Sequence, residues 1–568
     1  MSKMKKSIKD WLYKIFVVND NWTYIIKRIV YIFCFYGLCS LDQIAGSAVP
    51  YVLHGAKHYT GVFVAVIILT AYKLRDFKKL PYLIWIAVYI CISLLLYNPL
   101  TEIIDNEIAL VANLIGIGLY GIIIIRMIYL FAIEKRRPNV KKVPFCICSI
   151  MLLVMTIIRT DFDWPLLILL ISVSFYLTDF DKRDLQNLFC GILDGLILGF
   201  IVIQGQALMH RPYDKVRYEG YYAQPSLNAL FYLCAYYAAL GKCYLLKLQK
   251  RNIFLRFIYI ILAGFIAATM LFTGSRAAFI TSIVLTLLFL VFQMVSSAKH
   301  KLGVLVTNGL LIFASIVTCI LPTYWLIRYI PVRVNEPVYF LADEFSGLEH
   351  KVQKNDPNDS DKYVELGEAV DLMFERYLWF LDDEVVEQIE DFIRNFPDKL
   401  SLSLQVNAAE YEEDIESDES IEPGADREHP LVWSGEEGEG AYDVRIDIYR
   451  YFVKKLKLIG EKDAVQGVWI TKDFLASHCH NVFLQMAYDF GIIVGVIFIA
   501  IVLMSYIYSV NSLFKNHTVE NHYQKFVAIG YTTIFVIFGT FEIDWLFGQL
   551  AFILFFLMLY VMVHEEKR

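Results

Sequence analysis

Residues 253–295 read IFLRFIYIILAGFIAATMLFTGSRAAFITSIVLTLLFLVFQMV, in which two long apolar runs, 253–272 and 277–295, flank a short polar turn. Each run has the length that a helix needs to cross about 30 Å of hydrocarbon. Backbone N–H and C=O groups find no water inside a bilayer, so such a run forms a helix that bonds them internally. This stretch therefore predicts two antiparallel membrane-spanning helices joined by a tight turn.

The rest of the chain repeats this pattern. Its 568 residues are 57% hydrophobic and 19% charged, with a mean hydropathy of +0.50, which excludes a disordered or collagen-like chain. The scattered cysteines indicate no disulfide framework, and the first 24 residues lack the apolar core of a signal peptide. We predict an all-α polytopic membrane protein of about 14 (12–14) transmembrane helices, with spans near 25–48, 60–73, 80–98, 108–133, 143–158, 163–178, 188–209, 227–246, 253–272, 277–295, 303–327, 482–510, 524–541 and 544–563.

Lys and Arg residues divide unevenly between the two sides of these spans. They gather at both termini and in alternate loops such as 135–142 and 242–256, and cytoplasmic loops of membrane proteins carry this excess. We therefore expect a multi-pass protein of a bacterial cytoplasmic (inner or cell) membrane with both termini in the cytoplasm. The opposite loops hold few basic residues, namely Lys57, Arg159, Arg211, Lys215, Arg217 and Arg276.

This topology divides the chain into three parts, a transmembrane bundle (1–327), a large extracytoplasmic loop (328–481) and C-terminal transmembrane helices (482–568). The loop is too long to lack structure altogether, and apolar residues at helical spacing predict one or two amphipathic helices over 363–396. Residues 405–440 are acidic and poor in aliphatic side chains, which predicts a flexible, solvated stretch. Such an acidic surface argues against a nucleic-acid partner.

Polar residues at the outer membrane boundary are candidates for function, because charge at that depth is costly. The outward loop 210–226 contains Arg211, Arg217 and Tyr218 among further tyrosines. Arginines suit bidentate phosphate contact and aromatic rings suit a sugar face, so this loop fits a diphosphate-linked sugar. An aromatic belt with arginines reaching to lipid head groups explains the same residues.

The turn LFTGSRAAFI (271–280) places Arg276 at the start of a helix. Unpaired backbone N–H groups and the positive end of the helix dipole favour an anion there. The alternative is that Ser275 caps the helix and Arg276 anchors it at the membrane interface.

The end of the large loop, FLASHCHNVFLQMAYDFGIIVGVIF (474–498), places His480 and Asn481 directly before an apolar helix. A neutral histidine can take a proton from a hydroxyl near pH 7, whereas a surface histidine at a helix start is the simpler alternative. His478, Cys479 and His480 offer too few ligands for a tetrahedral metal site. Residues 446–463 predict a basic amphipathic helix. Three alternatives are open for it: it contributes Arg450 to the site, it contacts lipid phosphates, or it exposes a solvated basic face.

These residues follow one another in an order that resembles the O-antigen ligase and O-antigen polymerase superfamily over about residues 190–510. The order is an outward Arg-x-x-Gly loop (217–220), the TGSRAAF turn, one large loop with an Arg-led amphipathic helix, and HNVFLQMAYDFGIIVG at the next span. The chain departs from the family pattern in its fourteen rather than about twelve predicted spans, its acidic loop and its Gln224-Pro225-Ser226 segment, which leave the acceptor open.

The resemblance implies a metal-independent glycosyltransferase that takes a glycan from a polyprenyl diphosphate carrier and transfers it to a hydroxyl acceptor in surface polysaccharide (O-antigen, capsule or exopolysaccharide) polymerisation or ligation. His480 matches the family's catalytic base, Arg276 and Arg217 match its diphosphate-binding arginines, and Arg450 matches less closely. Other proteins of a polysaccharide assembly pathway are the expected partners besides the bilayer.

The proposed chemistry is consistent with the residues themselves. Displacement of a lipid diphosphate by a sugar hydroxyl needs a base and cations, which His480 and the arginines supply, and it needs no metal ion or other cofactor. A single base predicts inversion at the anomeric carbon. Glu542 and Asp544 are candidates to orient His480 through its second ring nitrogen.

Two other classes also fit parts of the sequence. A lipid-glycan flippase or other transporter would be polytopic with charges inside the membrane, but it does not explain a long outward loop that ends in His-Asn. A membrane sensor would explain an acidic outer domain, although the cytoplasmic loops are short for an output domain.

Overall fold

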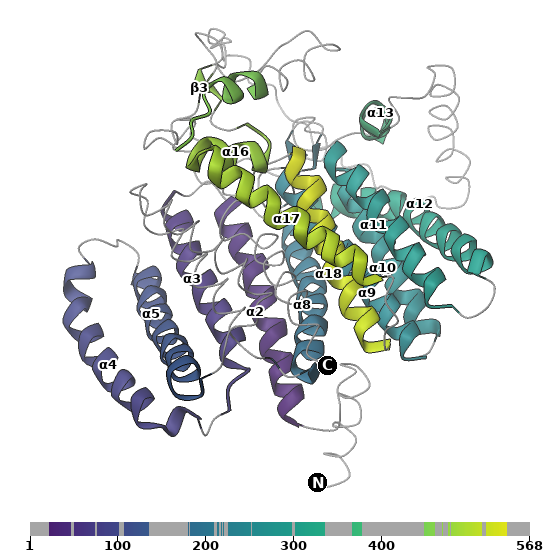
Figure 1. The fold of residues 1–568 in the computed structure, drawn as a ribbon. Helices are drawn as coiled ribbons and strands as arrows, with labels where there is room; N and C mark the ends of the chain where they lie inside the picture. Colours follow the sequence, from purple (N-terminus) through teal and green to yellow (C-terminus); the bar gives the residue numbers. More distant parts are fainter. Residues whose placement is uncertain are drawn as a thin grey trace.

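The computed structural model describes residues 22–46, 50–73, 76–101, 107–135, 180, 182–209, 213–214, 217–218, 220, 225–250, 253–297, 301–334, 366–377, 448–459, 468–469, 475–476, 479–513 and 519–541. Within these ranges the chain is an array of long apolar helices (Figure 1), so the prediction of an all-α multi-pass membrane protein is confirmed. The helices are α2 (Trp22–Gly46), α3 (Pro50–Leu69), α4 (Leu80–Thr101), α5 (Glu107–Ile128), α8 (Lys182–Met209), α9 (Pro225–Leu248), α10 (Ile253–Leu271), α11 (Arg276–Val295), α12 (Lys301–Val334), α13 (Leu366–Tyr377), α16 (Val482–Phe490), α17 (Ile492–Leu513) and α18 (Val519–Phe541).

Small elements complete the described part of the chain. A 3₁₀ turn η1 (Asp76–Lys78) precedes α4, and a π-helical turn η2 (Tyr129–Ile133) follows α5. Strand β1 (Tyr213–Asp214) pairs antiparallel with β2 (Arg217–Tyr218), and β3 (Val468–Trp469) pairs antiparallel with β4 (Leu475–Ala476).

Nine helices of the described part are long and apolar enough to cross a membrane. Shorter apolar helices over Thr60–Leu69 and Ile492–Met504 match two more of the predicted spans. The predicted spans 143–158, 163–178 and 544–563 lie outside the described residues, so the total of fourteen stays a prediction.

Contacts between neighbouring helices fix the direction of each one. In α9 and α18, the Tyr237 hydroxyl donates to the Phe526 carbonyl and the Tyr531 hydroxyl donates to the Cys234 carbonyl at 3.2 Å, so these helices are antiparallel. In α10 and α12, Gly264 contacts Ser315 and Phe272 contacts Tyr324, so these two are parallel. The bundle therefore has a "Ser275 end", where α10 ends and α11 begins, and a "Lys247 end", where α9 ends and α10 begins.

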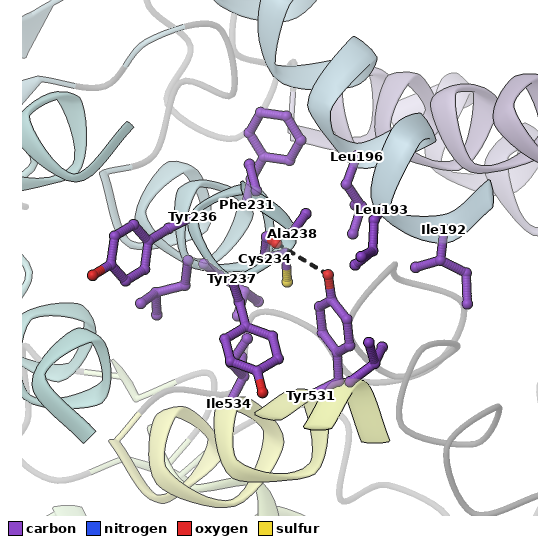
Figure 2. Packing of buried hydrophobic residues seen from close by; sticks show 14 of the residues in the cluster. Ile192, Leu193, Leu196, Phe231, Cys234, Tyr236, Tyr237, Ala238, Tyr531 and Ile534 are labelled. Carbon is purple, nitrogen blue, oxygen red and sulfur yellow. Dashed lines mark hydrogen bonds between the residues drawn. The ribbon is translucent and has the colours of Figure 1, made fainter. Parts of the chain in front are cut away.

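The core between α8, α9 and α18 is close-packed. Figure 2 shows Leu193 and Leu196 of α8 facing Phe231 of α9, with Tyr531 of α18 reaching across to Cys234. The Tyr237 ring stacks on Phe526 with centroids 4.7 Å apart. Close-packed aromatic contacts of this kind limit how far the helices can move relative to one another.

A buried group of charges ties α2, α8 and α9 together. Asp194 of α8 pairs with Arg28 of α2 at 2.9 Å and also with Lys242 of α9. The cations are 1% and 2% exposed. Arg28 also donates to Asn187, whose amide donates to the Tyr24 carbonyl. Charges buried among apolar helices are stable only when paired in this way.

The structure corrects one predicted span and extends another helix. The run 482–510, predicted as one span, is two helices that separate at Gly491, where φ is +98°. A side chain is strained at that angle, so glycine permits the break. Helix α12 continues past the predicted boundary at 327 to Val334. Of the basic segment 446–463, residues 448–454 are helical.

We predict that Asp194→Asn lowers the stability of the protein strongly. The change leaves two buried cations without their carboxylate, and breaking a buried pair costs about 3–5 kcal/mol. The measurement is the heat-unfolding midpoint of detergent-purified protein. Asp184→Asn is the matched control, because Asp184 pairs with one cation, Lys27, whose side chain is 20% exposed, whereas Asp194 pairs with two cations that are 2% exposed. The loss of stability in Asp184→Asn should therefore be smaller. Equal losses in the two variants would contradict this account.

Candidate functional site

The short strand pair brings Arg217 onto the turn between α10 and α11. The backbone N–H of Tyr218 donates to the Phe272 carbonyl at 2.9 Å, and the Nε of Arg217 donates to the Thr273 carbonyl, also at 2.9 Å. The Nε bond fixes the plane of the Arg217 guanidinium, which is half-buried. Two of the predicted site segments are therefore in direct contact.

Tyr218 anchors this strand in the interior of the bundle. Its ring is fully buried, and its hydroxyl accepts a hydrogen bond from the Gln204 amide at 2.9 Å. The carbonyl oxygen of the same amide accepts from Tyr232 at 2.7 Å. This buried position makes Tyr218 an anchor of the Arg217 strand, so the predicted role for its ring in sugar binding would require the loop to move.

The turn itself is built from capping groups. Ser275 is the N-cap of α11 and accepts from the Ala278 N–H, as the alternative interpretation expected. Gly274 has φ +63°, a conformation in which a residue with a side chain would be strained, so glycine suits this position. Arg276 follows in the first turn of α11 with an exposed side chain.

Helix α13, from the large loop, lies on the same turn. The Tyr377 hydroxyl donates to the Leu271 carbonyl at 2.7 Å, and its ring lies 4.6 Å from that of Phe279. Burial raises the pKa of Tyr377, while the nearby guanidinium of Arg217 acts in the opposite direction. The hydroxyl is therefore a neutral donor. It follows that the large loop contributes directly to the frame of the turn, as well as connecting two spans.

The His480–Asn481 pair forms the start of α16. The Asn481 side-chain oxygen accepts from the Phe483 and Leu484 N–H groups at 3.0 and 2.9 Å, and its amide donates to the Thr540 carbonyl at 3.0 Å. Thr540 lies at the end of α18, which runs antiparallel to α9 and so ends at the Ser275 end. The same end of the bundle therefore holds His480, Arg217 and Arg276.

The backbone of His480 is held in an unusual conformation. Its φ is +48°, in the left-handed region that residues with a side chain rarely adopt, and its carbonyl accepts from the Tyr449 hydroxyl at 3.3 Å. The His480 side chain is half-buried. Strained backbone of this kind is frequent at functional sites, where the surrounding structure holds it in place.

Cys479 is turned away from the site. It packs with Ile448 and Phe452, and its thiol donates to the Asn481 carbonyl at 3.2 Å. Burial raises the pKa of this thiol to about 12, so it is protonated at neutral pH, whereas a metal ligand is a thiolate. Among the described residues, no group of three His, Cys, Asp or Glu side chains is arranged to hold a metal ion.

The helix 448–454 attaches to α16 from the side. Phe452 packs edge-on against Tyr488 with centroids 4.6 Å apart, and the Lys457 carbonyl accepts from the Ile492 N–H at 3.0 Å. Arg450 is exposed on this helix. Figure 1 shows α13, β3 and α16 at one end of the bundle.

Three predicted site residues, Arg211, Glu542 and Asp544, lie outside the described residues. Other residues that frame the site were not predicted. Tyr377 and Thr540 act through contacts distant in sequence that no local pattern reveals, whereas Gln204 is an amide inside an apolar run, which is a usable signal of a buried polar contact.

No protein-family model, curated protein or solved structure matches the chain. The interpretation of the site therefore depends on its own geometry.

We predict that Asn481→Ala lowers the heat-unfolding midpoint, because it removes both the α16 cap and the bond to α18. Loss of an N-cap side chain costs about 0.5–2 kcal/mol. Asn481→Ser is the matched comparison, since serine retains a capping oxygen but is too short to reproduce the bond to Thr540. Its heat-unfolding midpoint should lie between those of the parent and the alanine variant. An alanine variant as stable as the parent would show that the cap contributes nothing.

Proposed function

We propose that the protein is an extracytoplasmic glycosyltransferase that moves a glycan from a polyprenyl diphosphate carrier to a hydroxyl acceptor. The observation that carries the proposal is the joining of Arg217 to the Arg276 turn, at the end of the bundle where His480 begins α16. A histidine and two arginines at the edge of a membrane bundle suit a reaction that removes one proton and releases an anionic lipid diphosphate.

In the proposed reaction, the acceptor hydroxyl attacks the anomeric carbon of the donor sugar. His480 takes the hydroxyl proton, a new C–O bond forms, and the bond from the anomeric carbon to the diphosphate breaks with its electron pair on the departing oxygen. One displacement inverts the anomeric centre. The half-buried position of His480 suits this role, since it leaves part of the ring accessible to an acceptor.

The arginines and the start of α11 would stabilise the departing diphosphate. Arg217 is oriented by its bond to Thr273, and Arg276 stands beside the positive end of the α11 dipole. Fixed cations in a site of low dielectric stabilise developing charge without having to reorganise. This electrostatic set supplies what a metal ion provides in other transferases, so the proposal includes no metal and no cofactor.

The proposed orientation places the Ser275 end outside the cytoplasm and the Lys247 end inside. The loops 249–252 and 296–301 at the Lys247 end are rich in Lys and Arg and contain no Asp or Glu, which is typical of cytoplasmic loops. The large loop leaves α12 and returns to α16 at the Ser275 end, so it would lie beside the donor and hold the acceptor. Arg450 is the residue of this loop that we assign to substrate contact.

We predict that His480→Ala reduces transfer by about 10²–10⁴-fold, the contribution of a general base, while membrane abundance stays near that of the parent. The assay uses purified protein and a lipid-linked glycan, with product separated by length. His478→Ala is the neighbouring control and should retain most activity. An active His480→Ala variant together with an inactive His478→Ala variant would assign the base to the other histidine.

A further prediction concerns the arginines. Arg276→Lys and Arg217→Lys should each remain strongly impaired, because an ammonium group cannot reproduce a bidentate guanidinium contact with a diphosphate. Arg183→Lys, at an exposed position near the start of α8, is the charge-matched control and should be active. Activity of the parent should survive EDTA. Rescue of a chelator-treated enzyme by Mg²⁺ or Mn²⁺ alone would refute the metal-free mechanism.

The same purified assay separates this proposal from a transporter or a sensor, since neither of those would process the glycan without a second enzyme. Surface glycan from a deletion strain distinguishes the two reaction types. Loss of the length ladder with one repeat unit retained indicates a polymerase, whereas full-length polymer left unattached indicates a ligase.

A further inference from the structure

The Lys247 end of the bundle holds a fixed cation of its own. The Lys247 ammonium donates to the Gln293 carbonyl at 2.6 Å and to the Ser296 and Ser297 hydroxyls at 3.0 and 2.8 Å. These partners are neutral, so they hold the ammonium at the last turn of α11 without cancelling its charge. The negative end of the helix dipole offsets the charge in part.

A second cation lies beside it. The guanidinium of Arg256, in the first turn of α10, lies close enough to Lys247 and to the Cys243 thiol to interact with both electrostatically. Its Nε is buried and has no hydrogen-bond partner. A buried N–H without a partner is costly, so the guanidinium would be stabilised by a ligand oxygen that reached it.

Among the described residues, no acidic side chain balances this charge. No ion pair there joins a carboxylate to Lys247 or Arg256. The adjoining loops, 249–252 (QKRN) and 296–301 (SSAKHK), add further Lys and Arg and contain no Asp or Glu. Within the part of the chain that the structure describes, the cluster is therefore a positive site without a paired carboxylate.

Exposed apolar side chains stand at the same end of the bundle on α10, α11 and α12. Ile253 is 75% exposed, Phe254 63% and Leu302 72%, and Val295 is also exposed. Apolar area of this extent beside cations at the end of a membrane helix is complementary to a molecule that carries both an anionic head and hydrocarbon chains. A free anion would cover the cations and leave these apolar side chains exposed.

We propose that Arg256 and Lys250 form a binding site for the phosphate head group of an anionic membrane lipid, whose acyl chains lie along the apolar start of α10. Lys247 contributes its charge alone, because its three N–H donors are already bonded. Helix α10 has 19 residues, so this site lies about 28 Å from the Ser275 end. It is separate from the proposed catalytic residues and does not depend on their assignment.

The test uses delipidated full-length protein reconstituted in nanodiscs of phosphatidylcholine with a small fraction of phosphatidylglycerol. Retained phosphatidylglycerol is counted by native mass spectrometry across a titration. Parent protein should retain it in preference to phosphatidylcholine. Arg256→Gln and Lys250→Gln should each weaken retention about fivefold, the effect of one cation near a membrane surface, and Arg256→Lys should weaken it less. Lys250 is exposed, so its variant tests the site without disturbing packing.

Lys73→Gln is the matched control, because Lys73 is an exposed cation in the loop between α3 and α4 on the same side. If Lys73→Gln weakens retention as much as Arg256→Gln, general surface charge explains the binding and the site is refuted. If inorganic phosphate at millimolar concentration displaces the lipid from the parent protein, the site takes a free anion and the lipid assignment is wrong. Equal retention of the two lipids by the parent would also overturn the proposal.

Discussion

The position of the candidate site depends on one carboxylate, Asp194, held between the buried cations Arg28 and Lys242. Because each charge would be unstable alone in an apolar bundle, the three helices that carry them are fixed relative to one another. Gln204 lies on the same helix as Asp194, about 15 Å further along, and links Tyr232 of α9 to Tyr218 of the Arg217 strand. Two polar contacts at different depths thus hold α8 against α9, and the second one sets where Arg217 can lie.

Much of the bundle follows from local sequence, because helix length and capping are local properties. The apolar runs 253–272 and 277–295 correspond closely to α10 and α11, and Ser275 caps α11 as its residue type predicts. The break at Gly491 was missed because a glycine inside a long apolar run also fits an unbroken membrane helix. The contact of Arg217 with Thr273 and that of Tyr377 with Leu271 join residues far apart in sequence. No periodicity or motif encodes such pairings, so the sequence could suggest candidate residues but not the contacts that frame them.

Asn481 illustrates how one residue can serve both structure and the proposed chemistry. Its oxygen caps α16 while its amide binds the end of α18, so the residue before it must bring the chain into the helix from a fixed direction. His480 meets this constraint with a left-handed backbone. A glycine would adopt that φ at lower cost, while histidine adopts it more readily than most residues with a side chain. The proposed role of His480 as a base would give a reason for a histidine at this position.

The charges at the two ends of α11 bear on the proposed binding of an anion at the Ser275 end. At its C-terminal end, Lys247 faces the negative end of the helix dipole, which is favourable. At its N-terminal end, Arg276 stands in the first turn, where a cation opposes the dipole by about 0.3–1 kcal/mol. Arg217 adds a second positive charge to the same turn. An anion bound between these groups, as we propose for the diphosphate, would be attracted by both arginines and by the positive end of the helix dipole.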